Sequence, residues 1–424
     1  MLSRRAITTL SLAAAICVFS TGLAFAQQRA PASAPLSAHP KVRAITAFVR
    51  IDREHYQAEI AEALTMLRRA KAEIEKSGYE VESVRITTQP FPEYVRGLSR
   101  EQALAFFRAY DDLATRERFD PNIGPAMLSD NDDPQSAALL AEVLSQTNNL
   151  ESSIIVAAND GIHWKAITET AKLVKYVETH SAHSQGNFNF TATAMLEPYG
   201  PFFPGSYHTG AGHQFSIGME SANVVEEVFS QNSGDAPKAT EALIRALTPH
   251  ALAMDKIGLQ LEQETGWKYM GFDPTPAPLK NVSIGAAIEK FTGAPLGSSG
   301  SMTAVSIITN AVRAIPVQQV GYRGLMLPVL EDSDIAQRWS EGRVHVDTLL
   351  AYSAVCGTGL DTIPLPGDVS EAQIEKMLGD MASLAFKWNK PLSARLQPVQ
   401  GKKAGEQTEF DNPFLVNAII QPLP

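Results

Sequence analysis

The amino-acid sequence predicts an α/β fold, because short β-branched runs alternate with longer stretches of helical periodicity. The first such pair is a strand at 42–51 and a helix at 56–74, whose apolar residues recur every three or four positions and stop before Gly78. Hydrophobic residues make up 44% of the 424 residues, which is enough for a large core. The length allows one large α/β domain or two ordinary ones.

The same alternation continues along the chain. Further strands are expected at 81–87, 153–157, 214–219, 360–363 and 392–396. Further helices are expected at 100–115, 134–145, 163–178, 224–229, 236–264, 282–291, 302–315 and 349–355, and after Ser370. The pattern breaks after Gln185 into polar and aromatic residues that include Asn187 and Asn189, a composition typical of a loop that binds a ligand.

The first residues read as an export signal. Residues 1–26 combine Arg4 and Arg5, an apolar stretch and a small-residue cleavage site, and they predict a signal peptide. Residues 27–40 predict a flexible leader, and the folded domain is expected at 41–424. The expected location is therefore periplasmic or secreted. The paired arginines leave the twin-arginine route open beside the general secretory one.

The net charge limits the kinds of binding partner to expect, and the cysteine content limits disulfide formation. The formal net charge is −10, and removing residues 1–26 takes away two arginines and no acid, so it becomes −12. A negative chain without basic clusters argues against binding nucleic acid or an anionic membrane. A small molecule is the expected partner, and a homo-oligomer is left open. After signal cleavage Cys356 is the one remaining cysteine, so no internal disulfide can form.

A segment rich in glycine, proline and acids stands out at residues 356–368 (CGTGLDTIPLPGD). It follows a predicted helix that ends in glycines, and it places Asp361 at a strand start and Asp368 just before a helix with a capping box. This run resembles the signature of the DUF711 (UPF0210-like) family. So do the runs at 201–204 (PFFP), 218–222 (GMESA), 271–278 (GFDPTPAP) and 327–332 (LPVLED).

The resemblance covers roughly residues 41–424. It implies a single large domain with a ten-stranded α/β barrel, similar to that of pyruvate formate-lyase. It implies no reaction. Radical chemistry of the glycyl type is not expected, because Gly401 and Gly405 lie among lysines without the aromatic-flanked glycine motif of that class.

Five acids lie at the ends of apolar runs or in the resembling motifs, where a barrel brings its loops together. They are Glu220, Asp273, Glu331, Asp361 and Asp368. We expect at least three of their carboxyl groups inside one cavity, as acid/base groups or as metal ligands. The competing interpretation for each single acid is a helix cap or a partner for a nearby arginine.

His208 joins this candidate set because it follows a stiff aromatic loop of the kind that lines small-molecule pockets. With Glu220, Asp273 and Asp361 it forms the candidate ligand set for a divalent metal, although no spacing matches a known zinc signature. A divalent metal is therefore a candidate cofactor, with its identity open.

A glycine and serine loop before the predicted helix at 302–315 suits an anionic group, because it offers backbone N–H groups and hydroxyls at a helix start. The predicted substrate-binding residues are Asn187, Asn189, Gly297, Ser298, Ser299, Gly300 and Ser301. The loop lacks the Gly-Lys-Ser/Thr ending of a nucleotide-binding P-loop, which excludes a kinase or ATPase of that type.

Cys356 is open to two interpretations. A nucleophile is one, but a helix C-terminus raises the pKa of a nearby thiol, which favours a packed, inert side chain. The whole pattern predicts an exported hydrolase or lyase that acts on a small polar or anionic metabolite at a carboxylate-rich barrel mouth. The alternative is a non-catalytic periplasmic binding protein, and turnover distinguishes the two.

Overall fold

The computed structural model describes residues 37–423, and within them it forms one ten-stranded mixed sheet. The predicted signal peptide and most of the predicted leader lie outside the described residues. The strands are β1 (Lys41–Phe48), β2 (Val81–Thr87), β3 (Asp120–Pro125), β4 (Glu151–Ala158), β5 (Gly161–Ile162), β6 (Phe190–Ala194), β7 (Gln214–Glu220), β8 (Lys268–Asp273), β9 (Gly359–Pro366) and β10 (Leu392–Val399).

The strands fall into two groups that run in opposite directions. The order is β8-β7-β1-β2-β3-β4-β6-β10-β9, and β5 pairs with β4 as a short hairpin. Strands β1, β2, β3, β4 and β6 are parallel, whereas β7 is antiparallel to β1 and β10 is antiparallel to β6. One end of the strands therefore carries the starts of β1, β2, β3, β4 and β6 together with the end of β7.

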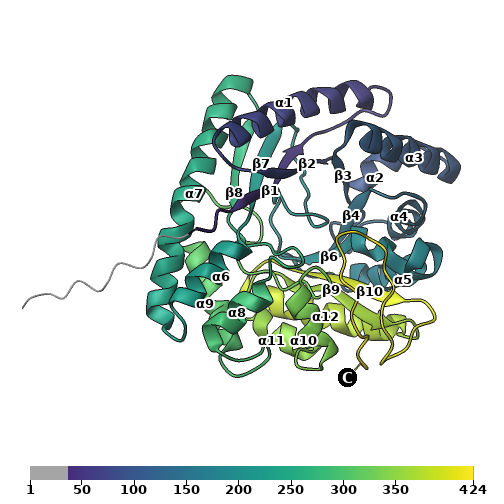
Figure 1. The fold of residues 1–424 in the computed structure, drawn as a ribbon. Helices are drawn as coiled ribbons and strands as arrows, with labels where there is room; N and C mark the ends of the chain where they lie inside the picture. The colour runs from purple at the N-terminus through teal and green to yellow at the C-terminus, as the bar shows by residue number, and fades with distance from the viewer. Residues whose placement is uncertain (1–36, 424) are drawn as a thin grey trace, which may run out of the picture. The chain divides into compact units, whose positions relative to one another are not determined.

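Helices lie outside the strands, as Figure 1 shows. They are α1 (Tyr56–Lys76), α2 (Phe91–Val95), α3 (Arg100–Glu117), α4 (Gln135–Gln146), α5 (Trp164–His180), α6 (Ala222–Gln231), α7 (Ala236–Thr265), α8 (Ile284–Thr292), α9 (Ser301–Arg313), α10 (Ser333–Ser340), α11 (Val346–Ser353) and α12 (Glu371–Trp388), with the 3-10 segment η1 (Ala182–Asn189). The predicted apolar stripe of the first helix is buried, including Ile60, Leu64 and Leu67. Full burial of each such side chain stabilises the fold by roughly 1.5–3 kcal/mol.

The sequence pattern did not predict strands β3, β5, β6 and β8, and β3 is the clearest case. Its residues read Asp-Pro-Asn-Ile-Gly-Pro, and two prolines in six residues indicate a turn, because proline donates no ladder hydrogen bond. The strand nevertheless pairs with both β2 and β4, with a register irregularity between Asn122 and Pro125. Prolines also occur in β9 at Pro364 and Pro366, where the edge position tolerates them.

The predicted α/β fold with ten strands is confirmed, but hydrogen bonds between strands do not close the sheet. The two edge strands β8 and β9 are bridged instead by residues 318–331, here called the seam segment. At one end Phe272 of β8 donates its N–H to Gln318 O at 2.8 Å, and at the other Val329 donates to Asp361 O of β9 at 3.0 Å. An irregular segment thus occupies the position that a closing pair of strands has in a complete barrel.

Among residues 37–423, no helix has the length and apolar character needed to span a membrane.

Candidate functional site

A cavity of about 480 Å³ lies inside the curved sheet, and strands from both groups contribute to it. Its charged lining residues are Arg43, Glu82, Arg85, Asp120, Glu151, Glu331, Asp361 and Arg395. Amide and aromatic side chains complete the wall, among them Asn148, Asn149, Asn189, Phe188, Phe203 and Tyr322. Its size suits a small metabolite.

Strand direction explains why these residues meet. Asp120 and Glu151 are the first residues of the parallel neighbours β3 and β4, so they lie at the same end of the strands. Glu220 is the last residue of antiparallel β7 and pairs with Lys41, which places it at that end too. On β10 the residue before Arg395 pairs with Ala192 of β6, and this brings Arg395 close to the start of β6.

Arg395 forms the best-paired part of the cavity. Its Nε donates to Asp361 Oδ1 at 2.7 Å, and its Nη2 donates to Glu331 Oε1. All three residues are less than 9% exposed, and the guanidinium carbon lies 4.9 Å from the centre of the Phe188 ring. Burial alone would lower the pKa of Arg395, but Asp361 and Glu331 outweigh it and raise that pKa. Burial also raises the pKa of Glu331.

A second arginine, Arg43, holds two carboxylates with one nitrogen. Its Nη1 lies 3.0 Å from Glu82 Oε2 and 3.0 Å from Glu220 Oε2. Burial and then the charge of Glu82 raise the pKa of Glu220 to about 7, although Arg43 opposes the shift. Glu220 therefore reaches the cavity wall through Arg43 and changes protonation near neutral pH.

The third arginine, Arg85, is only partly used by the protein. Its Nε donates to Ser83 Oγ at 2.9 Å and lies 3.5 Å from Asp120 Oδ2, and its guanidinium covers the Phe203 ring at 4.9 Å. Its two terminal nitrogens donate no hydrogen bond to any residue between 37 and 423. This planar fork is the side-chain geometry that best fits a carboxylate or phosphate group.

Glu151 shares the cavity with Arg85 and accepts no side-chain hydrogen bond from the described part of the chain. Burial raises the pKa of Glu151 to about 8, and the charge of Arg85 opposes that shift. Most Glu151 side chains are therefore protonated at pH 7. A carboxylic acid held protonated beside an anion-binding group can donate a proton to a bound molecule.

The predicted meeting of at least three of the five acids in one cavity is wrong. Glu331 and Asp361 line the cavity, and Glu220 contacts it through Arg43. Asp273 is buried elsewhere, and its carboxylate accepts the backbone N–H groups of Thr275, Tyr322 and Arg323. Burial raises the pKa of Asp273 to about 6 against these hydrogen bonds, and its observed contacts orient the seam segment.

Asp368 and His208 also lie away from the cavity lining. Asp368 is exposed in the turn after β9. His208 is fully buried with Nε2 2.7 Å from Val49 O, and burial lowers its pKa to about 4, so its ring is neutral. The aromatic loop that precedes His208 does contribute Phe202, Phe203 and Pro204 to the wall.

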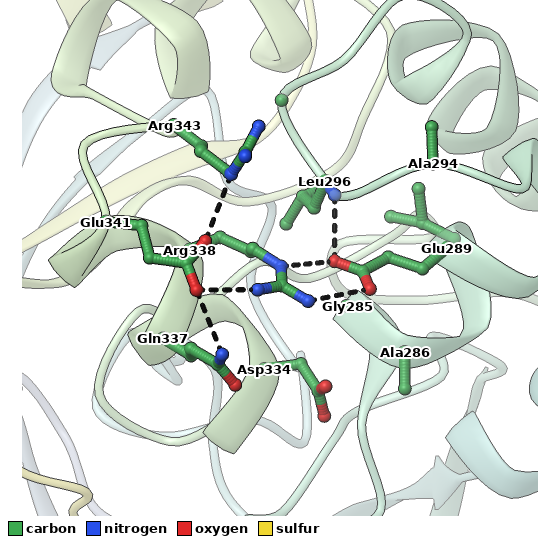
Figure 2. A network of polar contacts seen from close by, with 12 residues as sticks. Gly285, Ala286, Glu289, Ala294, Leu296, Asp334, Gln337, Arg338, Glu341 and Arg343 are labelled. Atoms are coloured by element: carbon green, nitrogen blue, oxygen red, sulfur yellow. Dashed lines mark hydrogen bonds and ion pairs between the residues drawn. The ribbon is translucent and has the colours of Figure 1, made fainter.

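The predicted anion-binding loop is also outside the cavity. Gly297, Ser298, Ser299, Gly300 and Ser301 line neither described cavity, and the Gly297 N–H is taken by Ser301 Oγ at 3.2 Å. Figure 2 shows the neighbouring network, in which Glu289 of α8 binds Arg338 of α10 through two hydrogen bonds and also accepts the Leu296 N–H. These contacts fix the loop against the outer helices.

The two asparagines predicted to bind substrate differ in position. Asn189 lines the cavity, and its Nδ2 donates to Asn148 O at 2.9 Å. Asn187 is buried and donates to Val174 O of α5 at 3.0 Å, which joins η1 to that helix. Cys356 is 1% exposed after α11 with Sγ 3.8 Å from Ser353 Oγ, a position suited to a packed thiol.

The metal-ligand candidates do not assemble. Between residues 37 and 423 no group of three or more His, Cys, Asp or Glu side chains is arranged to hold a metal ion. Asp361 is bound by Arg395, Glu220 by Arg43, and Asp273 and His208 by backbone groups. These four side chains are therefore used by separate neighbours.

Sequence reasoning missed the residues that give the cavity its charge pattern. Arg43, Glu82, Arg85 and Arg395 each lie inside a strand that the pattern does predict, and Glu151 lies two residues before one. Charged residues are seldom buried without a partner. Three arginines inside apolar strands were therefore an available signal that acids would face them from other strands.

Comparison with known proteins places these residues in a family. The model described as "Uncharacterised ACR (DUF711)" matches residues 36–411. A UPF0210 protein of Pyrobaculum aerophilum is 33% identical over 293 residues, 66% of this chain and 64% of that protein, so the match spans less than two thirds of that relative. UPF0210 proteins of Pyrobaculum arsenaticum and Leuconostoc mesenteroides are 30% and 25% identical, covering 78% and 82% of this chain and 76% and 80% of theirs.

Among solved structures, the anaerobic ribonucleotide reductase of Thermotoga maritima in complex with dATP and CTP aligns with a TM-score of 0.45 at 9% identity. The alignment covers 89% of this chain and 79% of that one.

Proposed function

Taking as premise that the chain belongs to the DUF711 family, we propose that it is an enzyme of hydrolase or lyase type that binds a small anionic metabolite in the cavity inside the sheet. The observation that carries the proposal is that Arg85, whose terminal nitrogens have no partner among the described residues, lines the same cavity as Glu151, whose pKa burial raises to about 8. Arg85 binds the anionic group, and Glu151 donates a proton to the departing group.

Asp361 supplies the opposite function. Arg395 holds its Oδ1, whereas Oδ2 accepts no hydrogen bond from residues 37–423, and Asp361 lines the cavity. A carboxylate fixed at one oxygen and free at the other can accept a proton from water or from a substrate carbon. One acid and one base are the groups that hydrolysis and elimination both require, so the reaction class rests on this pair.

Burying the charged side chains of the cavity costs free energy, and that cost argues that they bind a ligand. Three arginines and five carboxylates around one interior space would destabilise the fold unless each charge had a partner or a ligand. Arg85 and Glu151 lack full pairing, so a bound molecule would complete the site. A non-catalytic binding protein would need the arginine but would have no use for an acid of raised pKa.

A ligand screen with two variants tests the proposal. Thermal shift is measured for small carboxylic acids, amides and lactones on the wild type and on Arg85→Met, with Arg245→Met, at an exposed arginine on α7, as the matched control for loss of charge. A ligand at about 100 times its Kd stabilises a protein by about 2.7 kcal/mol. We expect such a shift in the wild type and in the control, and its loss in Arg85→Met.

Turnover of each stabilising compound is then followed by mass spectrometry. We expect Glu151→Gln to bind the ligand but to turn it over at least about 100-fold more slowly. Equal stabilisation of Arg85→Met would contradict the binding site. Binding without conversion by the wild type, over the whole set of stabilising compounds, would favour the binding-protein alternative.

Export to the periplasm or medium is part of the proposal and rests on residues 1–26 alone. Replacing Arg4 and Arg5 by lysine keeps the charge and removes the paired guanidinium groups. Retention of folded protein in the cytoplasm would support the twin-arginine route. Unchanged export would indicate the general secretory route.

A further inference from the structure

A second cavity, of about 700 Å³, lies on the outer side of the seam segment. It is formed where the C-terminal ends of α9 and α12 approach residues 317–323 and the chain just before β10. None of the side chains that the proposal above uses contributes to it, so the two sites can be tested separately.

The lining of this second cavity carries three positive charges and no acid. Arg313 ends α9, Arg323 belongs to the seam segment, and Lys390 follows α12. The chain as a whole has a formal net charge of −10, so a cationic cavity without a single lining carboxylate is a local reversal. Outside the lining, Glu197 is an exposed side chain whose Oε2 lies 3.7 Å from Arg323 Nη2.

Helix ends account for part of this charge. The C-terminus of a helix carries about half a negative charge, and three helices end here, α9, α11 and α12. Lys390 Nζ donates to Ser353 O at the end of α11 at 2.6 Å, and Gln319 already donates to the carbonyls of Val312 and Ile315 at the end of α9. Three cations against these ends leave an excess of roughly one to two positive charges.

The cations are also short of partners. Arg313 Nε donates to Arg323 O at 3.2 Å, and its terminal nitrogens bind no residue within 37–423. Lys390 is only 6% exposed and has the Ser353 carbonyl as its one hydrogen-bond acceptor in the described chain. Burial lowers the pKa of Lys390, because a buried ammonium group without a counter-ion is less stable than the neutral amine.

A large aromatic surface completes the cavity. Trp388 is the last residue of α12, lines the cavity, and is 60% exposed. A ligand held by these cations can also pack its apolar part against the exposed ring. We propose that this second cavity is a binding site for a small, multiply charged anion, held by Arg313, Arg323 and Lys390 and packed against Trp388.

Calorimetric titration of the full chain with pyrophosphate tests the site, and citrate provides the second probe. Saturable binding of pyrophosphate with the tighter Kd would indicate a phosphate ester as the natural ligand, and tighter citrate would indicate a polycarboxylate. We expect Arg313→Gln and Arg323→Gln each to weaken binding at least about tenfold, because each removes a charge-assisted contact. Absence of saturable binding of both probes at low ionic strength would overturn the proposal.

Three further variants locate the binding. Arg245→Gln removes an exposed arginine on α7 and should bind as the wild type does. Arg85→Met should also bind normally, which separates this site from the first cavity. Lys390→Met is avoided because it leaves the Ser353 carbonyl without its donor. Arg313→Lys keeps the charge and should restore most of the affinity that Arg313→Gln loses, whereas a folding defect would not be rescued in this way.

Trp388 gives an independent readout. The chain has four tryptophans, and Trp164 is the other exposed one. Saturating pyrophosphate should change the emission of the wild type, and Trp388→Phe should abolish that change while calorimetry still detects binding. An emission change that persists in Trp388→Phe, or binding that is unaffected by both arginine variants, would place the anion elsewhere.

Discussion

Two groups of charged residues line one cavity but differ in how completely their charges are paired. The Arg395 cluster consists of Arg395, Asp361 and Glu331, and the Arg85 wall consists of Arg85 and Glu151. Arg395 donates to two buried carboxylates, Asp361 and Glu331, from two of its nitrogens. Arg85 donates one hydrogen bond, its Nε lies 3.5 Å from Asp120 Oδ2, and burial raises the pKa of Glu151 in the same cavity. Arg395 and Glu331 fix the position of Asp361 and leave one of its oxygens without a hydrogen-bond partner among residues 37–423, whereas Arg85 and Glu151 remain free to bind and to exchange a proton. The degree of pairing therefore separates the charges that hold the site in place from those available to a ligand better than charge alone does.

The largest effect is expected from breaking the paired cluster. Arg395→Met leaves two buried carboxylates side by side without a counter-ion, and removing one partner of a buried ion pair costs about 3–5 kcal/mol. Urea unfolding at pH 7 measures the loss. Arg85→Met is the matched comparison inside the same cavity and should cost less than about 1 kcal/mol, because little pairing is lost. Similar losses in both variants would show that the two arginines are equally structural.

A second, smaller loss is expected at Asp273. Its carboxylate accepts three backbone N–H groups, two of them in the seam segment, so Asp273→Asn replaces an acceptor oxygen by a donor. Leaving one buried N–H unpaired costs about 1–3 kcal/mol. Because Tyr322 also lines the first cavity, ligand affinity should fall together with stability. A variant with lower stability and unchanged affinity would show that the seam segment does not position that wall.

Much of the fold was predictable and less of the site was. Periodicity identified most of the helices, because a helix that packs on a sheet carries an apolar stripe that repeats in the sequence. Strand β3 was missed because its prolines indicate a turn. The acids at the ends of β7 and β8 were selected from the rule that working residues follow strands in a parallel barrel. Here the strand groups oppose each other, so the cavity collects the starts of β1 to β4, and Glu151 was passed over.

The pairing of residues far apart in the chain was beyond the sequence pattern. Arg395 and Glu331 are 64 residues apart, and Arg43 and Glu220 are 177 apart. Only the register of the sheet and the course of the seam segment bring them together. Asp361 was found because it belongs to a recognisable motif, whereas its partner Arg395 lies in an ordinary apolar strand without a motif of its own.

The pH dependence of stability sharpens the view of the unpaired wall. The pKa of Glu151 is raised from 4.5 to about 8, so its protonated form stabilises the folded state. That contribution is fully present below about pH 4.5 and is lost as the pH rises through about 8. Relative to Glu151→Gln, the wild type should lose on the order of 3 °C in Tm between pH 5 and pH 9.

Glu241→Gln, which removes an exposed carboxylate on α7, is the control for losing any acid. Calorimetric scans of the three proteins across that range provide the comparison. A constant Tm difference between wild type and Glu151→Gln would mean that Glu151 is ionised in the folded protein at neutral pH.

The smallest effect is expected at a pair outside the cavity, where solvent screens the charges. Glu289 and Arg338 are joined by two hydrogen bonds, with side chains 21% and 16% exposed, and Figure 2 shows them between α8 and α10. Glu289→Gln should cost about 0.5–1 kcal/mol, well below Arg395→Met, because water stabilises the charges that remain.

The pH dependence of this pair is opposite to that of Glu151. Burial raises the pKa of Glu289, but Arg338 and the Leu296 N–H outweigh burial and lower it. Its contribution is therefore present above pH 4.5 and is lost as the pH falls through the lowered pKa. The pH trends for Glu151 and Glu289 thus run in opposite directions, since one carboxyl group is stabilised protonated and the other ionised. Scans of Glu289→Gln from pH 3 to pH 7 test this, and a cost as large as that of Arg395→Met would remove the distinction between buried and screened pairs.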